Sequence, residues 1–169
     1  ANLKAVLDNI MYTIMGRMMI SKSAVVLFDS DENKFFLANS KGIKKTETTF
    51  SHANLSDQDF LISDAKQSEL MEYLLANKLV LGIPLQNDET TIGIFALGKK
   101  LSNDTYTENE RSFLSTLGRI AASFIQKNLT FDQLQKSNKR LDKRVYQLTT
   151  LLEIGQKLNE TINFEDILK

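Results

Sequence analysis

An apolar repeat with alternating spacings of three and four residues runs through the last third of the chain and most constrains its fold. No proline interrupts residues 107–160. On a single helix this stripe would face water, whereas two copies of the helix can bury it between them. The sequence therefore predicts a long helix that pairs with a second copy in a parallel coiled coil. The predicted seam consists of Leu117, Ile120, Phe124, Phe131, Leu134, Asn138, Leu141, Val145, Leu148 and Leu152.

Two features of the repeat predict its details. Asn138 lies between Leu134 and Leu141, where a buried amide would set the register of a two-stranded coil. Downstream, a second set of apolar residues is shifted by a few positions from the first. This shift indicates a stutter that locally loosens the winding. The shifted residues are Leu151, Ile154 and Leu158.

The first hundred residues alternate between helical and strand-like patterns. The apolar residues at helical spacing between Leu3 and Met18 fit core packing, with a dimer face as the alternative. The hairpins are recognised by apolar runs on either side of short polar turns. The patterns predict a helix at 3–20, strands at 23–29 and 34–40, a loop at 41–57, one or two short helices within 58–77, and a second hairpin at 79–100.

Local signals fix two further positions. Pro84 has no amide donor, so we expect it at a bulge or on an unpaired edge of the sheet. Thr107 and Glu110 form a capping box that predicts the start of the long helix. The order of elements predicts an α+β fold, with an antiparallel sheet and the first and last helices packed on one face.

Composition excludes several functions. Lysine plus arginine equals aspartate plus glutamate at 21 each, so no net charge attracts nucleic acid or an anionic membrane. The chain has no cysteine and a single histidine, His52, which argues against metal sites, covalent cofactors and thiol catalysis. No apolar run reaches the ~20 residues needed to span a bilayer. We therefore expect a cytoplasmic, non-enzymatic chain without a cofactor or metal.

The hairpin "LVLGIPL…TTIGIFALGKK" and the following "YTENERSFLSTLGRIAASFIQKN" resemble a GAF domain. The resemblance covers roughly residues 3–128 and is strongest from 79 to 127. It implies a sensory and dimerisation module that relays its state to a downstream output domain. Many members of the family bind a small molecule between the sheet and the irregular helical segment.

Relatives that regulate cyclic-nucleotide phosphodiesterases carry a dispersed signature that the resemblance places on five positions here. Lysine is kept at Lys99, Tyr106 and Glu110 are conservative changes, and Gly98 and Arg111 depart from the signature. The degraded signature implies that cyclic nucleotides do not bind. The surviving opposite charges predict an ion pair between Lys99 and Glu110.

Four residues lie where the family builds its ligand cavity: His52, Phe60, Asp64 and Tyr73. They could stack on and hydrogen-bond a small polar aromatic ligand. The alternative is that Phe60 and Tyr73 fill the core while His52 and Asp64 are solvated. Residues 50–76 carry five carboxylates, one lysine and no arginine, which favours a neutral or cationic ligand.

The predicted organisation is a sensor domain at 1–128, a coiled-coil signalling linker at 129–160 and the start of a following domain at 161–169. The last residues, "LLEIGQKLNETINFEDILK", resemble the first helix of a second GAF domain, with a hinge near Gly155. The chain would then belong to a longer protein whose output domain is a kinase, a phosphatase or a cyclase. The predicted function is a regulatory sensor that forms a homodimer through its terminal helices. A purely structural dimerisation module and a cyclic-nucleotide-binding domain are the alternatives.

Overall fold

The computed structural model describes residues 2–88 and 90–168, with side chains up to Asn163. It divides into two compact units, Ala1–Asn128 and Leu129–Lys169. Within the described residues, no helix is both long enough and apolar enough to cross a membrane.

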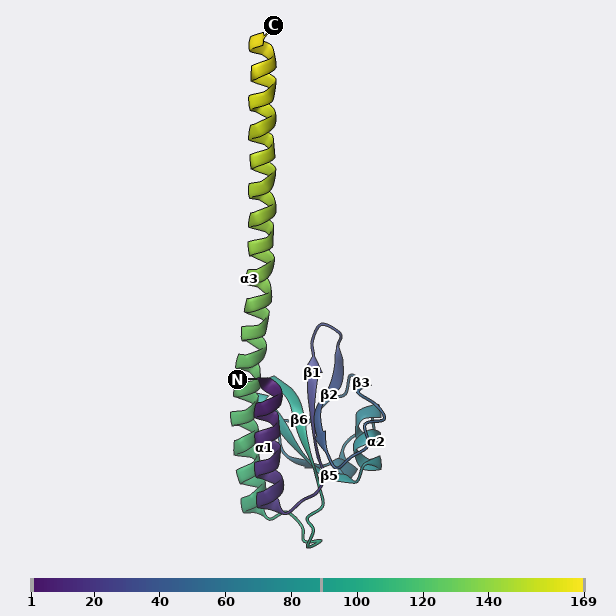
Figure 1. The fold of residues 1–169 in the computed structure, drawn as a ribbon. Coiled ribbons are helices and arrows are strands. Elements are labelled where there is room, and N and C mark those ends of the chain that lie inside the picture. The colour runs from purple at the N-terminus through teal and green to yellow at the C-terminus, as the bar shows by residue number, and fades with distance from the viewer. Residues whose placement is uncertain (1, 89, 169) are drawn as a thin grey trace. The chain divides into compact units, whose positions relative to one another are not determined.

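A six-stranded sheet forms the centre of the first unit (Figure 1). Its strand order is β3-β2-β1-β6-β5-β4, and every neighbouring pair is antiparallel. The antiparallel sheet confirms the predicted α+β class. The strands are β1 (Ser23–Asp29), β2 (Lys34–Lys41), β3 (Thr49–Ser51), β4 (Phe60–Leu61), β5 (Leu79–Asn87) and β6 (Thr90–Gly98).

Helices cover both faces of this sheet (Figure 1). Helix α1 (Leu3–Met18) buries Leu7, Met11, Ile14 and Met18, so its apolar stripe packs in the core. Helix α1 and the first turns of α3 (Glu108–Leu168) lie side by side on one face, where the Arg17 guanidinium sits 4.3 Å from the Phe113 ring centroid. Helix α2 (Glu69–Ala76) packs on the opposite face.

The alternation of side chains along the strands supplies a core on each face. Val26 and Ile94 belong to the cluster that contains Leu74 of α2. Their neighbours in the same strands, Val25 before Val26 and Phe95 after Ile94, are equally buried and face the α1 side. The two central strands therefore read as continuous apolar runs because both of their faces are covered.

One prediction for the connecting segments is wrong and one is incomplete. Residues 41–57 are predicted as loop, yet β3 lies within them and pairs with β2. The one or two short helices predicted within 58–77 are present as the 3-10 helix η1 (Ile62–Asp64) and α2, but the preceding strand β4 (Phe60–Leu61) was not predicted. Strands of two or three residues are too short to show a period of two, and their pairing partners hold them extended.

The local signals around α3 are confirmed. The Thr107 amide donates to Glu110 Oε1 and the Glu110 amide donates to Thr107 Oγ1, both at 3.2 Å, which is the capping box. Pro84 pairs with Ile94 of β6 and lies beyond Gly82, the last β5 residue that has a β4 partner. The proline therefore occupies the unpaired stretch of the edge.

The second unit is the continuation of α3. The helix runs through Gly155 without a break, so no change of secondary structure marks the predicted hinge. The side chains of 164–169, at the end of the predicted entry to a further domain, lie outside the described residues. The division into sensor, linker and following domain stays a prediction.

Candidate functional site

His52 lies just after β3 and packs against two phenylalanine rings. Its ring centroid is 5.7 Å from that of Phe28 in an edge-on arrangement and 6.2 Å from that of Phe35. The two phenylalanine centroids are 5.1 Å apart. Strands β1 and β2 therefore bring two phenylalanine rings together, and the His52 ring packs against both to form a cluster of three.

These three rings line an open cavity of about 330 Å³, here called the His52 cavity. None of its lining residues is lysine, arginine, aspartate or glutamate. Aromatic faces together with an amide and an imidazole suit a planar neutral molecule or a small organic cation. The lining consists of Phe28, Phe35, His52, Ala53, Asn54, Leu55 and Thr91.

The other three predicted ligand residues lie elsewhere. Tyr73 is buried, its ring lies 4.8 Å from that of Phe50, and its hydroxyl donates to the Lys44 carbonyl oxygen at 2.7 Å. Burial raises the pKa of the Tyr73 phenol. Phe60 packs against the same core cluster, and Asp64 is exposed at the end of η1. The structure thus brings Phe60 and Tyr73 into one core and leaves His52 at its own cavity. A ligand-binding role for the four stays a prediction.

The predicted ion pair between Lys99 and Glu110 is wrong. Glu110 instead accepts from Lys100 Nζ at 2.5 Å, whereas Lys99 is exposed. The chain stays extended after β6, since Lys100 forms a bridge with Ile20, so consecutive side chains point to opposite sides. The hydrogen bond from Lys100 lowers the pKa of the Glu110 carboxyl.

Tyr106 and Gly98, two further positions of the degraded signature, contact each other. The Tyr106 hydroxyl donates to the Gly98 carbonyl oxygen at 2.6 Å. Burial raises the pKa of this phenol well above its usual range. These contacts join the end of β6 to the start of α3.

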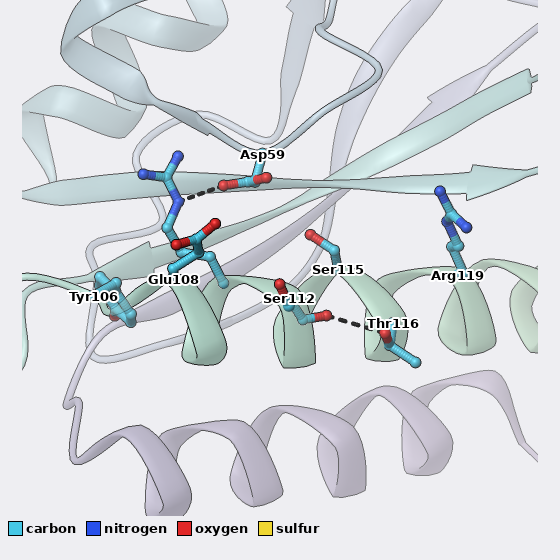
Figure 2. Close-up of a pocket in the computed structure, with 8 residues that line it drawn as sticks. Asp59, Tyr106, Glu108, Ser112, Ser115, Thr116 and Arg119 are labelled. Atoms are coloured by element: carbon cyan, nitrogen blue, oxygen red, sulfur yellow. Dashed lines mark hydrogen bonds and ion pairs between the residues drawn. The ribbon is translucent and has the colours of Figure 1, made fainter.

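Arg111, the last signature position, forms an ion pair with Asp59 (Figure 2). This pair links the connection that follows β3 to the first turn of α3. The two residues are 52 positions apart, so sequence spacing gave no reason to pair them.

The ion pair lies in a polar groove of about 650 Å³. Ser115 and Arg119 project from α3 on the side that faces Asp59 (Figure 2). Carboxylates and guanidinium groups balance in number, so the groove carries no net charge. Its lining consists of Asp59, Tyr106, Glu108, Arg111, Ser112, Ser115, Thr116 and Arg119.

Among the comparisons with known proteins, the comparison with solved structures is the one that finds similar proteins. No family model matches the sequence, and no curated protein matches it. The GAF domain of a phosphoenolpyruvate-protein phosphotransferase from Coxiella burnetii aligns with a TM-score of 0.62 at 15% identity, over 78% of this chain and 87% of that one.

Two further solved structures align with this chain over a similar range. A GAF domain/HD domain protein from Geobacter sulfurreducens aligns with a TM-score of 0.59 at 16% identity, over 74% of this chain and 94% of that one. Residues 122 to 287 of a methyl-accepting chemotaxis protein align with a TM-score of 0.58 at 12% identity, over 76% and 92%. The chain therefore has the GAF fold.

Proposed function

We propose that this chain, with its GAF fold, is a regulatory sensor and dimerisation module that passes a change of state along α3 to a signalling domain. The observation that carries the proposal is the apolar seam of α3. Its side chains in the second unit are large, apolar and 57 to 69% exposed: Phe131, Leu134, Leu141, Val145, Leu148 and Leu152.

A second copy of the chain is the occupant that fits this seam. The seam keeps the three-and-four spacing of a coiled coil, so an identical helix in parallel register covers every position at once. Asn138 then meets its own counterpart, where two amides can hydrogen-bond across the axis. A monomer would leave the whole stripe in water.

The His52 cavity supports a sensing role over a purely structural one. Its volume is at the low end of the ~300 to 1,000 Å³ typical of small-molecule sites. Side chains fill the neighbouring core around Tyr73, whereas this cavity is open between three aromatic rings. A ligand here would touch residues 52–55, which are part of the connection between β3 and β4.

The same connection reaches α3. Beyond the cavity it continues to Asp59, which pairs with Arg111 in the first turn of the helix. We propose that ligand binding shifts residues 52–59 and that the ion pair transmits this shift to α3. The backbone from residue 55 to Asp59 and the ion pair with Arg111 supply the physical connection on which this coupling depends.

Amide hydrogen exchange tests this route. Asp59→Asn removes the charge that holds Arg111, so exchange should rise both in residues 52–58 and in the first turn of α3. Asp57→Asn is the matched control, because it removes a neighbouring exposed carboxylate that forms no ion pair within the described residues. Equal exchange profiles for the two variants would remove the route.

The dimer is tested by two charges in the seam. Leu141→Lys with Leu148→Lys would place four ammonium groups at the axis of the coil, where none has a partner. Sedimentation should show a dimer for the unmodified chain and a monomer for this variant, with the far-ultraviolet spectrum of the sheet domain retained.

The control adds the same charge beside the seam. Gln133→Lys with Gln147→Lys changes two exposed positions on the outer side of the predicted coil. This variant should remain a dimer. If Leu141→Lys with Leu148→Lys is also dimeric, the interface lies on other surfaces and the proposed seam is wrong.

A further inference from the structure

A third pocket lies where β1 and β5 begin and where β6 and α2 end, and its lining is strongly basic. It encloses about 420 Å³. We call it the lysine pocket, because four of its ten lining residues are lysines and none is acidic. The lining consists of Ser21, Lys22, Leu75, Lys78, Leu79, Val80, Lys99, Lys100, Leu101 and Asn103.

The sheet brings these lysines together from three separate stretches of the chain. The Gly98 amide donates to the Lys22 carbonyl oxygen at 2.9 Å, which places the end of β6 beside the start of β1. Gly98 also pairs with Leu79, the residue after Lys78. A Cβ at Gly98 would lie 3.0 Å from Lys22 Cβ, so glycine leaves room for that side chain.

Three of the four ammonium groups have no counter-charge among the described residues. Lys100 is neutralised by Glu110 at 2.5 Å. Lys22, Lys78 and Lys99 form no ion pair within residues 2–88 and 90–163. Because the chain as a whole has equal numbers of acidic and basic residues, this excess of positive charge is local.

Apolar surface accompanies the charge. Leu75 and Leu101 are 44% and 66% exposed, and the fully buried Leu79 also contributes to the lining. Exposed leucines beside uncompensated lysines form an amphipathic lining, on which an anion alone would leave the apolar part uncovered. A ligand that covers both parts needs a negative head and an apolar body.

Lys78 of the pocket lining has an unusual backbone conformation. Lys78 follows the end of α2 with φ of 61°, in the left-handed region that favours glycine at this position. Its amide donates to the Leu75 carbonyl oxygen at 2.9 Å. A lysine in this conformation supplies an ammonium group at the rim of the pocket, which glycine would lack.

We infer that the lysine pocket binds a small organic anion that carries an apolar group. The lysines hold the negative head as point charges, without the fork geometry of arginine. The leucines cover the hydrocarbon or ring. This site differs from the His52 cavity in its lining residues and in the charge of the ligand it selects, so it does not depend on the proposed sensing role.

Three probes separate charge from apolar surface. Octanoate has both a negative head and a chain, octyltrimethylammonium has the same chain with the opposite charge, and inorganic phosphate has charge alone. In amide NMR titrations, octanoate should give saturable shifts at residues 78–80 and 99–101. The other two probes should give no saturable shifts there.

Paired variants test the residues. Lys78→Gln with Lys99→Gln should weaken octanoate binding by roughly tenfold through loss of two nearby charges. Lys45→Gln with Lys66→Gln removes the same charge from two exposed positions outside the pocket and should leave the affinity unchanged. The amide spectra outside the pocket should be unchanged in both variants, which would show that both are folded.

Several outcomes would overturn the inference. Equal binding of octanoate and octyltrimethylammonium would show that charge plays no part, and equal effects of the two variants would show that any lysine suffices. Binding to anionic phospholipid vesicles without binding of monomeric octanoate would identify a membrane-docking surface instead of a small-molecule site.

Discussion

A single step along the backbone decides which lysine reaches Glu110. Lys99 and Lys100 are adjacent and chemically equivalent, but the extended chain after β6 turns only Lys100 toward α3. The sequence correctly predicts that a lysine pairs with Glu110, but the partner is Lys100 and not Lys99. It does not reveal the side of the sheet on which each lysine lies, because that depends on where pairing with Ile20 continues.

A double-mutant cycle measures this pair. We expect a coupling energy of up to about 1 kcal/mol between Lys100→Ala and Glu110→Gln, since both side chains are partly buried. The matched cycle with Lys99→Ala should give coupling near zero. Urea unfolding of the single and double variants provides both values, and a larger coupling for Lys99 would contradict the assignment.

The pH dependence of stability follows from the lowered pKa of Glu110. Because the folded state holds this carboxyl below its unfolded pKa, the contribution is present at neutral pH and disappears as the pH falls through the carboxyl range. Glu110→Gln should therefore destabilise the domain at neutral pH and have progressively less effect in acid. A difference in unfolding free energy that stays constant from neutral to acidic pH would contradict this account.

At the scale of elements, Gly118 determines how closely α3 approaches β5. A Cβ at this position would lie 2.9 Å from the Pro84 carbonyl oxygen and 3.1 Å from Ile83 Cγ2. The first distance involves backbone, which cannot rotate away. Helix α3 can therefore approach β5 this closely only because residue 118 is glycine and has no side chain.

Gly118→Ala should destabilise the first unit by roughly 1 to 3 kcal/mol, as expected for overpacking. Gly16→Ala is the control, because a Cβ at Gly16 of α1 meets nothing within 4 Å. That substitution should stabilise the helix by up to about 1 kcal/mol. Chemical denaturation of the two variants gives the comparison, and similar effects of both would contradict the packing argument.

The strands and helices with clear periodicity were predictable, and the short elements were not. Strands β1, β2, β5 and β6 and helices α1 and α3 carry apolar patterns long enough to identify. Strands β3 and β4 exist because β2 and β5 offer them hydrogen bonds. His52 was predicted as a candidate ligand residue from the sequence. Its contacts with Phe28 and Phe35 could not be predicted, because they depend on the register between β1 and β2.

At the scale of the whole molecule, the chain has no net charge, but aromatic rings and ammonium groups line different pockets. The His52 cavity provides aromatic rings and no lysine or arginine. The lysine pocket provides ammonium groups and no aromatic ring. A cyclic nucleotide needs both a cation or amide donors for its phosphate and a stacking partner for its purine.

Neither place supplies this combination, and in the polar groove two carboxylates offset the two guanidinium groups, with Arg111 already paired to Asp59. We therefore predict no useful affinity for cyclic AMP or cyclic GMP. The five carboxylates within residues 50–76 add repulsion of a phosphate near the His52 cavity. Isothermal titration with millimolar nucleotide should give only heats of dilution. A micromolar binding isotherm for either nucleotide would contradict the prediction and restore the second-messenger alternative.

We propose above all that two copies of this chain form a sensor that pairs along α3. Native mass spectrometry of the protein purified from its host measures stoichiometry and retained ligand in one spectrum. We predict twice the mass of one chain, with at least one small molecule retained per dimer at low collision energy. A bare dimer at low collision energy would contradict the sensing role, and a monomer at all concentrations would contradict the pairing itself.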